Sequence, residues 1–197
     1  MNDEPIDIEA LKNDTEFQEN VRQLENEMYE LNSVARGYQL LDIRLAMQED
    51  EEAINELFAF IVGRSFDALG EYLTEGKPFD LSQPEEWAIA RALYEYAIQH
   101  YSEADTKNAK EVFLVLYHQI ADPVVKEAVM VHACAVMAGD DFDAFIDTRV
   151  DMSGLDPEDP KSVFLTTFSQ PAETLLAQWD VHVQAAKAEL KSLEENR

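Results

Sequence analysis

Three residues near the middle of the chain have side chains that could bind a metal ion. His118, His132 and Cys134 carry imidazole and thiol groups, which are common ligands of zinc. They lie on two apolar stretches that meet at Asp122-Pro123, a pair typical of the start of a helix. If the stretches form an antiparallel hairpin that turns near Asp122, His118 lies four residues before the turn and His132 ten residues after it.

This spacing keeps the three side chains apart. A mismatch of about six residues, at about 1.5 Å per residue, separates the two histidines by roughly 9 Å along the helix axis. His132 and Cys134 are two positions apart, which turns them about 200° from each other around one helix. We therefore interpret them as hydrogen-bonded core histidines and a buried thiol, and we predict no metal site.

Two other segments resemble functional loops but lack required residues. Residues 70–77 resemble a phosphate-binding loop, but five residues separate their two glycines instead of the required four. Pro78 also replaces the Ser or Thr that would hold Mg²⁺. Starting a calcium loop at Asp141 or Asp151 places neither Gly at its sixth position nor Glu at its twelfth. An irregular calcium site within residues 140–159 remains an alternative. The sequence thus predicts no catalytic residue, no cofactor and no metal ligand, and we expect the protein not to be an enzyme.

The two apolar stretches predict the core of the fold. Residues 112–120 and 124–138 are apolar nearly all round, so helices formed by them must be buried. Gly139 suits the position that ends the second helix. The longest charge-free apolar run, residues 128–139, is well short of the roughly 20 residues that a transmembrane helix needs. We predict a buried helical hairpin in a soluble protein with no membrane contact.

Helical patterns continue on both sides of this hairpin. Apolar residues at spacings of three and four follow the acidic run 48–52 and the capping sequence 82–85, and no strand pattern of useful length occurs. The predicted fold class is all-α, a bundle of about seven or eight helices around the central hairpin, with long N- and C-terminal helices. We expect a flexible N-terminus over residues 1–14 and a single helical domain over 15–197.

Heptad-type stripes mark both terminal helices. The predicted N-terminal arm helix, residues 15–47, and the predicted C-terminal helix, residues 171–195, alternate spacings of three and four between apolar residues. Such a stripe packs either on its own chain or on a second copy, and both interpretations stay open. The predicted interaction seam consists of Phe17, Val21, Leu24, Met28, Leu31, Tyr38, Leu176, Trp179, Val183, Leu190 and Leu193.

Acidic residues dominate the composition. The chain of 197 residues has 41 Asp and Glu against 15 Lys and Arg, which gives a net charge of −26. This charge repels nucleic acid and anionic membranes, and it favours a basic protein as partner. The single cysteine permits no intrachain disulfide, and the first residues lack the pattern of a signal peptide. We expect a cytoplasmic protein.

Three functional hypotheses follow from this sequence. The first, which we favour, is a non-enzymatic protein–protein interaction module that forms a homodimer through a terminal helix. The second is a DNA mimic or acidic decoy that binds a basic protein, since rows of carboxylates can imitate phosphates. The third is a small-molecule-binding protein or an enzyme without a recognisable motif, whose pocket between helices would be lined by Trp87, Tyr94, Tyr117 and Trp179.

Overall fold

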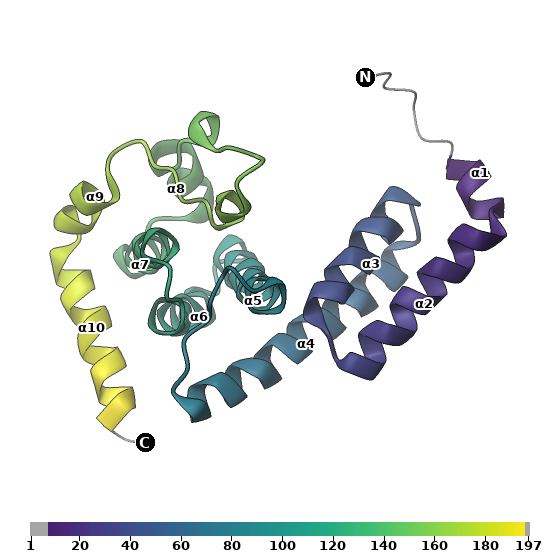
Figure 1. Cartoon of the computed structure of the whole chain (residues 1–197). Coiled ribbons are helices and arrows are strands. Elements are labelled where there is room, and N and C mark those ends of the chain that lie inside the picture. Colours follow the sequence, from purple (N-terminus) through teal and green to yellow (C-terminus); the bar gives the residue numbers. More distant parts are fainter. Residues whose placement is uncertain (1–7, 196–197) are drawn as a thin grey trace. The chain divides into compact units, whose positions relative to one another are not determined.

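A computed structural model describes residues 8–195 of the chain (Figure 1). These residues form ten α-helices and two 3₁₀ helices, and they contain no strand. Two isolated bridges join Phe79 to Ile120 and Val150 to Phe168. The predicted all-α class is therefore confirmed. The helices outnumber the expected seven or eight because each predicted terminal helix is divided, and because α1, Ile8–Asn13, lies in the predicted flexible N-terminus.

The chain divides into two compact units, Met1–Leu69 and Gly70–Arg197. The boundary falls inside α4, Glu51–Glu75, which is 25 residues long. Its first part contributes Leu57 and Ile61 to the buried core of the N-terminal unit. In its last part the Tyr72 ring packs against Phe79 in the C-terminal unit, with their centroids 4.9 Å apart. One helix thus supplies apolar residues to two separate cores.

The N-terminal unit contains a helical hairpin in place of the single predicted arm helix. Helix α2, Thr15–Leu31, ends at Asn32, whose φ of 51° is left-handed, and Ser33 caps α3, Val34–Ala46, by accepting a hydrogen bond from the backbone N–H of Arg36. Asn tolerates the left-handed region and Ser is a favoured N-cap, so the two residues reverse the chain. The heptad stripe across this position predicts one continuous helix, and that prediction is wrong.

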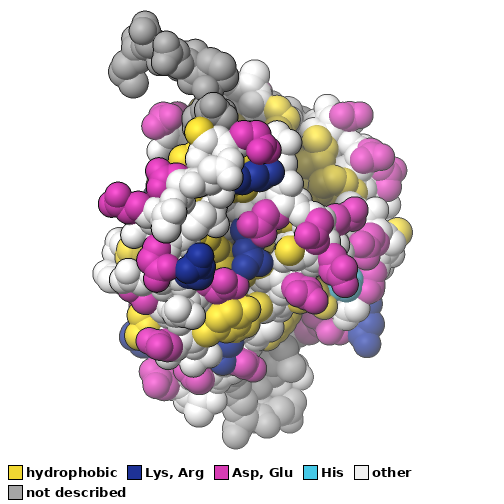
Figure 2. Space-filling view, turned by 90° about the vertical axis from the view of Figure 1, so that its right-hand side faces the viewer, with side chains coloured by type: hydrophobic (Ala, Val, Ile, Leu, Met, Phe, Trp, Pro, Cys, Tyr) yellow, Lys and Arg dark blue, Asp and Glu magenta, His cyan; other side chains and the backbone are white. Residues whose placement is uncertain are grey.

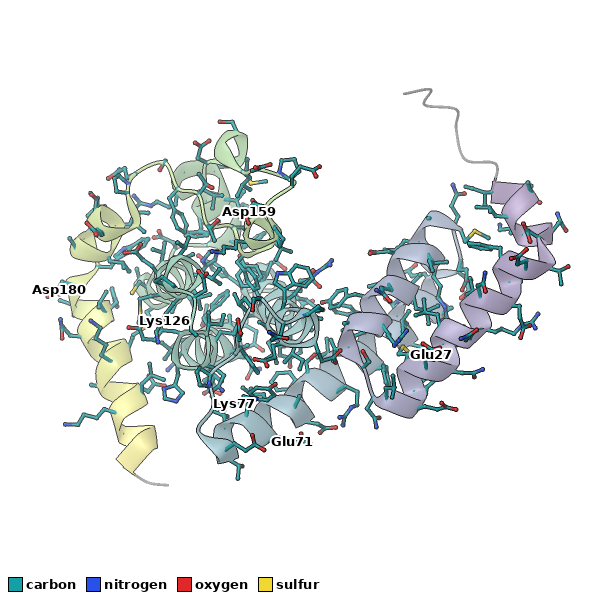
Figure 3. The ribbon with its side chains drawn as sticks, in the orientation of Figure 1. Glu27, Glu71, Lys77, Lys126, Asp159 and Asp180 are labelled. Carbon is teal, nitrogen blue, oxygen red and sulfur yellow. The ribbon has the colours of Figure 1, made fainter. Side chains whose placement is uncertain are left out.

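Two ion pairs join the helices of this hairpin. The Arg36 guanidinium lies 2.6 Å from a carboxylate oxygen of Glu27, and Arg44 lies 2.6 Å from Glu25. Figure 3 labels Glu27 on α2, on the side that faces α3. Because each pair connects a residue before the turn with one after it, α2 and α3 run antiparallel.

Gly37 lets α3 approach α4 closely within the N-terminal unit. A Cβ atom at this position would lie 2.8 Å from Cγ1 of Ile61, which is fully buried, and 3.6 Å from Sδ of Met28. Real Cβ atoms essentially never come as close as 2.8 Å to another heavy atom. Glycine at this position therefore sets the distance between the two helices.

The C-terminal unit is built around the predicted hairpin, which the structure confirms. Helix α6, Thr106–Gln119, and helix α7, Pro123–Ala138, are joined at Asp122, whose carboxylate accepts hydrogen bonds from the backbone N–H groups of Val124 and Val125. Gly139 ends α7 with a φ of 84°. Every residue from 128 to 136 is buried, as the apolar sequence requires.

The remaining helices of the C-terminal unit cover this hairpin. Helix α5, Pro84–Ser102, packs on α6, and the short helix α8, Phe142–Arg149, packs on α5. The 3₁₀ helices η1, Met152–Gly154, and η2, Pro160–Phe164, follow. The predicted C-terminal helix is two helices, α9, Ala172–Gln178, and α10, Asp180–Glu195, which lie along α7 (Figure 1).

Among the described helices, none combines the length and the apolar content that crossing a membrane would require.

The close approach at Gly37 predicts opposite effects for two glycine-to-alanine substitutions in the N-terminal unit. Gly37→Ala should lower the free energy of unfolding by about 1–3 kcal/mol, because the buried Ile61 side chain must move. Gly63→Ala should raise it by roughly 0.5–1 kcal/mol, because Ala is the better helix former and a Cβ at Gly63 meets no atom within 4 Å.

Urea unfolding measures the free energy of unfolding of each variant, and amide hydrogen exchange measures the change in α3 and α4. Equal effects of the two substitutions would contradict the close packing of α3 on α4.

Candidate interaction surface

The C-terminal half of the predicted seam packs on its own chain. Val183 and Leu190 of α10 are nearly buried, and Leu176 and Trp179 are half-buried. Helix α10 packs against α7 and α6, and the Lys110 ammonium of α6 lies 2.8 Å from the Glu189 carboxylate of α10. The side chain of Leu193 lies outside the described residues. This stripe therefore covers the central hairpin of the same chain.

The N-terminal half of the predicted seam is covered less completely. Met28 and Tyr38 are buried between the helices of the N-terminal unit. Phe17, Val21 and Leu24 are half-buried, and 64% of the Leu31 surface is exposed. Helix α2 therefore presents accessible apolar surface along a stripe that begins at Phe17 and ends at Leu31.

Leu45 adds to this apolar surface and is not part of the seam predicted from the sequence. Its side chain is 54% exposed near the end of α3. Because Arg44 pairs with Glu25, the antiparallel register places Leu45 level with the middle of α2. We call the group of Phe17, Val21, Leu24, Leu31 and Leu45 the α2 face. The turn signal Asn32-Ser33 in the sequence predicts that α3 folds back along α2, which brings Leu45 near this helix.

Negative charge surrounds the α2 face. The N-terminal unit has seventeen Asp and Glu against five Lys and Arg in its sequence. Ion pairs within the unit engage all five cations: Lys12 with Glu9, Arg22 with Glu19, Arg36 with Glu27, Arg44 with Glu25, and Arg64 with Asp67. Figure 2 shows acidic side chains dispersed over one face of the molecule, where they outnumber Lys and Arg. The excess charge is therefore spread over the surface.

His132 lies in the core of the C-terminal unit and has both ring nitrogens hydrogen-bonded. Its Nδ1 is 2.7 Å from the carbonyl oxygen of Ala128, which can only accept, so Nδ1 carries the proton. Its Nε2 is 3.0 Å from the Tyr94 hydroxyl and accepts that hydrogen bond. The rings of Phe113, Phe145 and Tyr94 surround the imidazole, with centroids 4.9–5.5 Å from its own.

Burial keeps His132 and Cys134 unreactive. Burial lowers the pKa of His132 to about 4, so the imidazole is neutral at pH 7. Burial likewise raises the pKa of the Cys134 thiol to about 12, which leaves almost no nucleophilic thiolate. His132 therefore serves as a packed, hydrogen-bonded core residue, as the spacing argument predicted.

The four aromatic residues of the third hypothesis do not line a common pocket. Tyr94 is buried against His132. Trp87 borders an open groove of about 450 Å³, whereas Tyr117 borders a different groove of about 260 Å³. The Trp179 ring lies under the Arg149 guanidinium, 5.3 Å from its centroid. A site combining these four residues is therefore not formed.

The carboxylates of the Asp-rich segment 140–159 cap short helices. Asp141 accepts from the backbone N–H of Ala144, Asp151 from Ser153 and Gly154, and Asp159 from Lys161. The hydrogen bonds from Ser153 and Gly154 lower the pKa of Asp151, with the Ser153 hydroxyl as the largest cause. Within residues 8–195, no three His, Cys, Asp or Glu side chains are grouped as metal ligands would be. These acids have a structural role as caps.

Comparison with known proteins finds no family model, no curated protein and no solved structure that matches this chain.

The buried imidazole predicts a specific pH dependence of stability. The unfolded chain binds a proton at His132 near pH 6.5 and the folded chain only near pH 4, so this residue's contribution is complete above pH 6.5 and is lost as the pH falls through that window. The full loss is on the order of 3 kcal/mol. In His132→Leu, the free energy of urea unfolding should change less between pH 6.5 and pH 4 than it does in the wild type.

Tyr94→Phe provides the matched control. It removes the hydrogen bond to Nε2 but keeps the burial that is the largest cause of the low pKa, so it should retain most of the wild-type pH dependence. If His132→Leu had the same pH dependence as the wild type, the buried neutral imidazole would be refuted.

Proposed function

We propose that this protein is a non-catalytic interaction module that forms a homodimer through the α2 face. The observation that carries the proposal is the difference between the two predicted seams. Val183 and Leu190 of the C-terminal stripe are covered by the same chain, whereas Leu31 and Leu45 remain more than half exposed. Grouped apolar side chains left accessible at a helical surface are typical of protein–protein contacts.

A two-fold arrangement fits the distribution of residues on the α2 face. In a symmetric dimer the same surface is used by both copies. Leu31 lies at the C-terminal end of α2 and Phe17 near its N-terminal end, so a fully overlapping antiparallel pair of α2 helices brings Leu31 of one copy toward Phe17 of the other. Each apolar residue then contributes twice to the interface.

Electrostatic repulsion opposes this association. Both copies have an excess of acidic residues in the N-terminal unit, and their Lys and Arg side chains are already engaged in ion pairs within the unit. Exposed charges of the same sign repel over roughly 8–10 Å at physiological salt. The dimer is thus held by apolar contacts and weakened by charge.

Removing exposed apolar side chains from the α2 face should weaken the dimer without unfolding the protein. The double variant Leu31→Ser with Leu45→Ser should lower the association constant of the dimer by at least about tenfold, because each copy loses two side chains that the interface buries. Sedimentation equilibrium at concentrations up to roughly 100 µM covers the weak affinities, around Kd 10⁻⁵ M, expected for such a contact.

Val181→Ser is the control for this experiment. Val181 is a 78% exposed apolar residue on α10 in the C-terminal unit, and its replacement should leave the association constant of the dimer unchanged. A wild-type chain that stays monomeric at these concentrations, or a double variant that dimerises as the wild type does, would refute the role of the α2 face.

The second candidate, an acidic decoy for a basic protein, is favoured by the same uncompensated charge. This candidate predicts the opposite dependence of binding affinity on salt concentration. Raising NaCl from about 50 mM to about 500 mM shortens the Debye length from roughly 14 Å to roughly 4 Å and should strengthen the homodimer by relieving repulsion. A complex with a basic protein should weaken over the same range.

Parallel sedimentation runs at the two salt concentrations measure this difference. Self-association that weakens with salt would contradict the apolar dimer and favour charge-driven binding.

A further inference from the structure

A small groove in the C-terminal unit lies between α7 and the pair α9 and α10. It is open to solvent and has a volume of about 260 Å³. Its floor is apolar, since Met130 and Val183 are buried there, and Leu176 and Tyr117 form its sides. Three charged residues border it: Lys126, Glu127 and Lys187. Figure 3 labels Lys126 on α7 and Asp180 at the start of α10.

The two lysines differ from most other cations of this unit. Lys110, Lys161 and Arg91 each lie within 2.8 Å of a carboxylate oxygen, and Arg149 lies 3.8 Å from one. Among the residues that the structure describes, Lys126 and Lys187 have no carboxylate within ion-pair distance. The Lys126 ammonium instead lies over the Tyr117 ring, 5.0 Å from its centroid.

The shared position of these two lysines distinguishes them from the other described lysines of this unit. Lys77 and Lys107 also have no carboxylate of the described residues within ion-pair distance, but they do not border this groove. Here two lysines without such a neighbour border the same apolar groove. Their charges are therefore available to an anion that also has an apolar part.

We propose that this groove binds a medium-chain monocarboxylate, with its carboxylate between Lys126 and Lys187 and its hydrocarbon chain over Met130, Leu176 and Val183. The apolar floor requires an apolar body, which inorganic anions lack. The volume of the groove is just below that of ordinary ligand pockets and suits a chain of about eight carbons. The groove is too small to hold a partner helix.

The net charge of the protein selects for a single negative charge on the ligand. The chain has a net charge of −26, and its long-range repulsion of a ligand grows with the ligand's own charge. Two nearby ammonium groups offset the repulsion of one carboxylate, and Glu127 at the same groove counteracts them. A dianionic phosphate would experience twice the repulsion without gaining apolar contact.

Octanoate is the probe that tests this inference on the full-length protein. Isothermal titration at about 150 mM NaCl should show one site, and the ¹³C-methyl signal of Met130 should shift on binding. Butanoate should bind at least about tenfold more weakly, because four fewer methylene groups are buried. Octylammonium should not shift the Met130 signal, because its charge has the wrong sign for the two lysines.

Charge variants assign the site to this groove. Lys126→Gln and Lys187→Gln should each weaken octanoate binding by about fivefold, and Glu127→Gln should strengthen it by a similar factor. Lys107→Gln is the matched control, because it removes one exposed lysine of the same unit that does not border the groove. It should leave the affinity unchanged.

Two outcomes would overturn the inference. One is the absence of any Met130 shift at millimolar octanoate. The other is an equal loss of affinity in Lys107→Gln and Lys126→Gln, which would mean that overall charge and not this groove controls binding. Neither result bears on the α2 face, which lies in the other unit.

Discussion

The burial of α7 is the constraint on which the C-terminal unit depends. This helix has no polar face, so each of its sides needs an apolar cover. Helices α6, α9 and α10 and the 3₁₀ helix η2 pack on α7, while α5 and α8 reach it through Tyr94 and Phe145, and residues 128–136 are all removed from water. The one polar ring inside, His132, keeps its place because the Ala128 carbonyl and the Tyr94 hydroxyl satisfy both of its nitrogens.

This constraint also determines which apolar stripe is left for other molecules. Because Val183 and Leu190 of α10 cover the central hairpin, these two side chains are not available to a partner protein. The N-terminal unit has no comparable need. Its core is smaller, it is built around Met28 and Ile61, and part of the α2 stripe extends beyond it. The proposed contact with a second copy follows from this inequality between the units.

Two properties of the surface charge affect both proposed contacts: its sign, and whether a nearby opposite charge neutralises it. The N-terminal unit neutralises its few cations internally, so its surface is a nearly uniform source of negative potential. In the C-terminal unit, Lys126 and Lys187 border the apolar floor of the groove beside α7. The proposed homodimer contact therefore depends on apolar side chains, and the proposed anion site depends on these two lysines.

Local chemical rules explain what the sequence by itself determined. The all-α class, the turn at Asp122-Pro123, the end of α7 at Gly139 and the burial of His132 all follow from capping preferences and apolar periodicity, which act over a few residues. The break at Asn32-Ser33 was also encoded locally, but the heptad stripe that runs across it suggested one continuous helix.

The tertiary structure alone decided how the stripes are used. Periodicity shows that a helix has an apolar face but not which surface will cover it, because that depends on contacts between residues far apart in the chain. Only packing shows that α10 covers its own hairpin, that Leu45 lies level with the middle of α2, and that Lys126 and Lys187 border one groove. The division into two units likewise depends on which distant helices meet each part of α4.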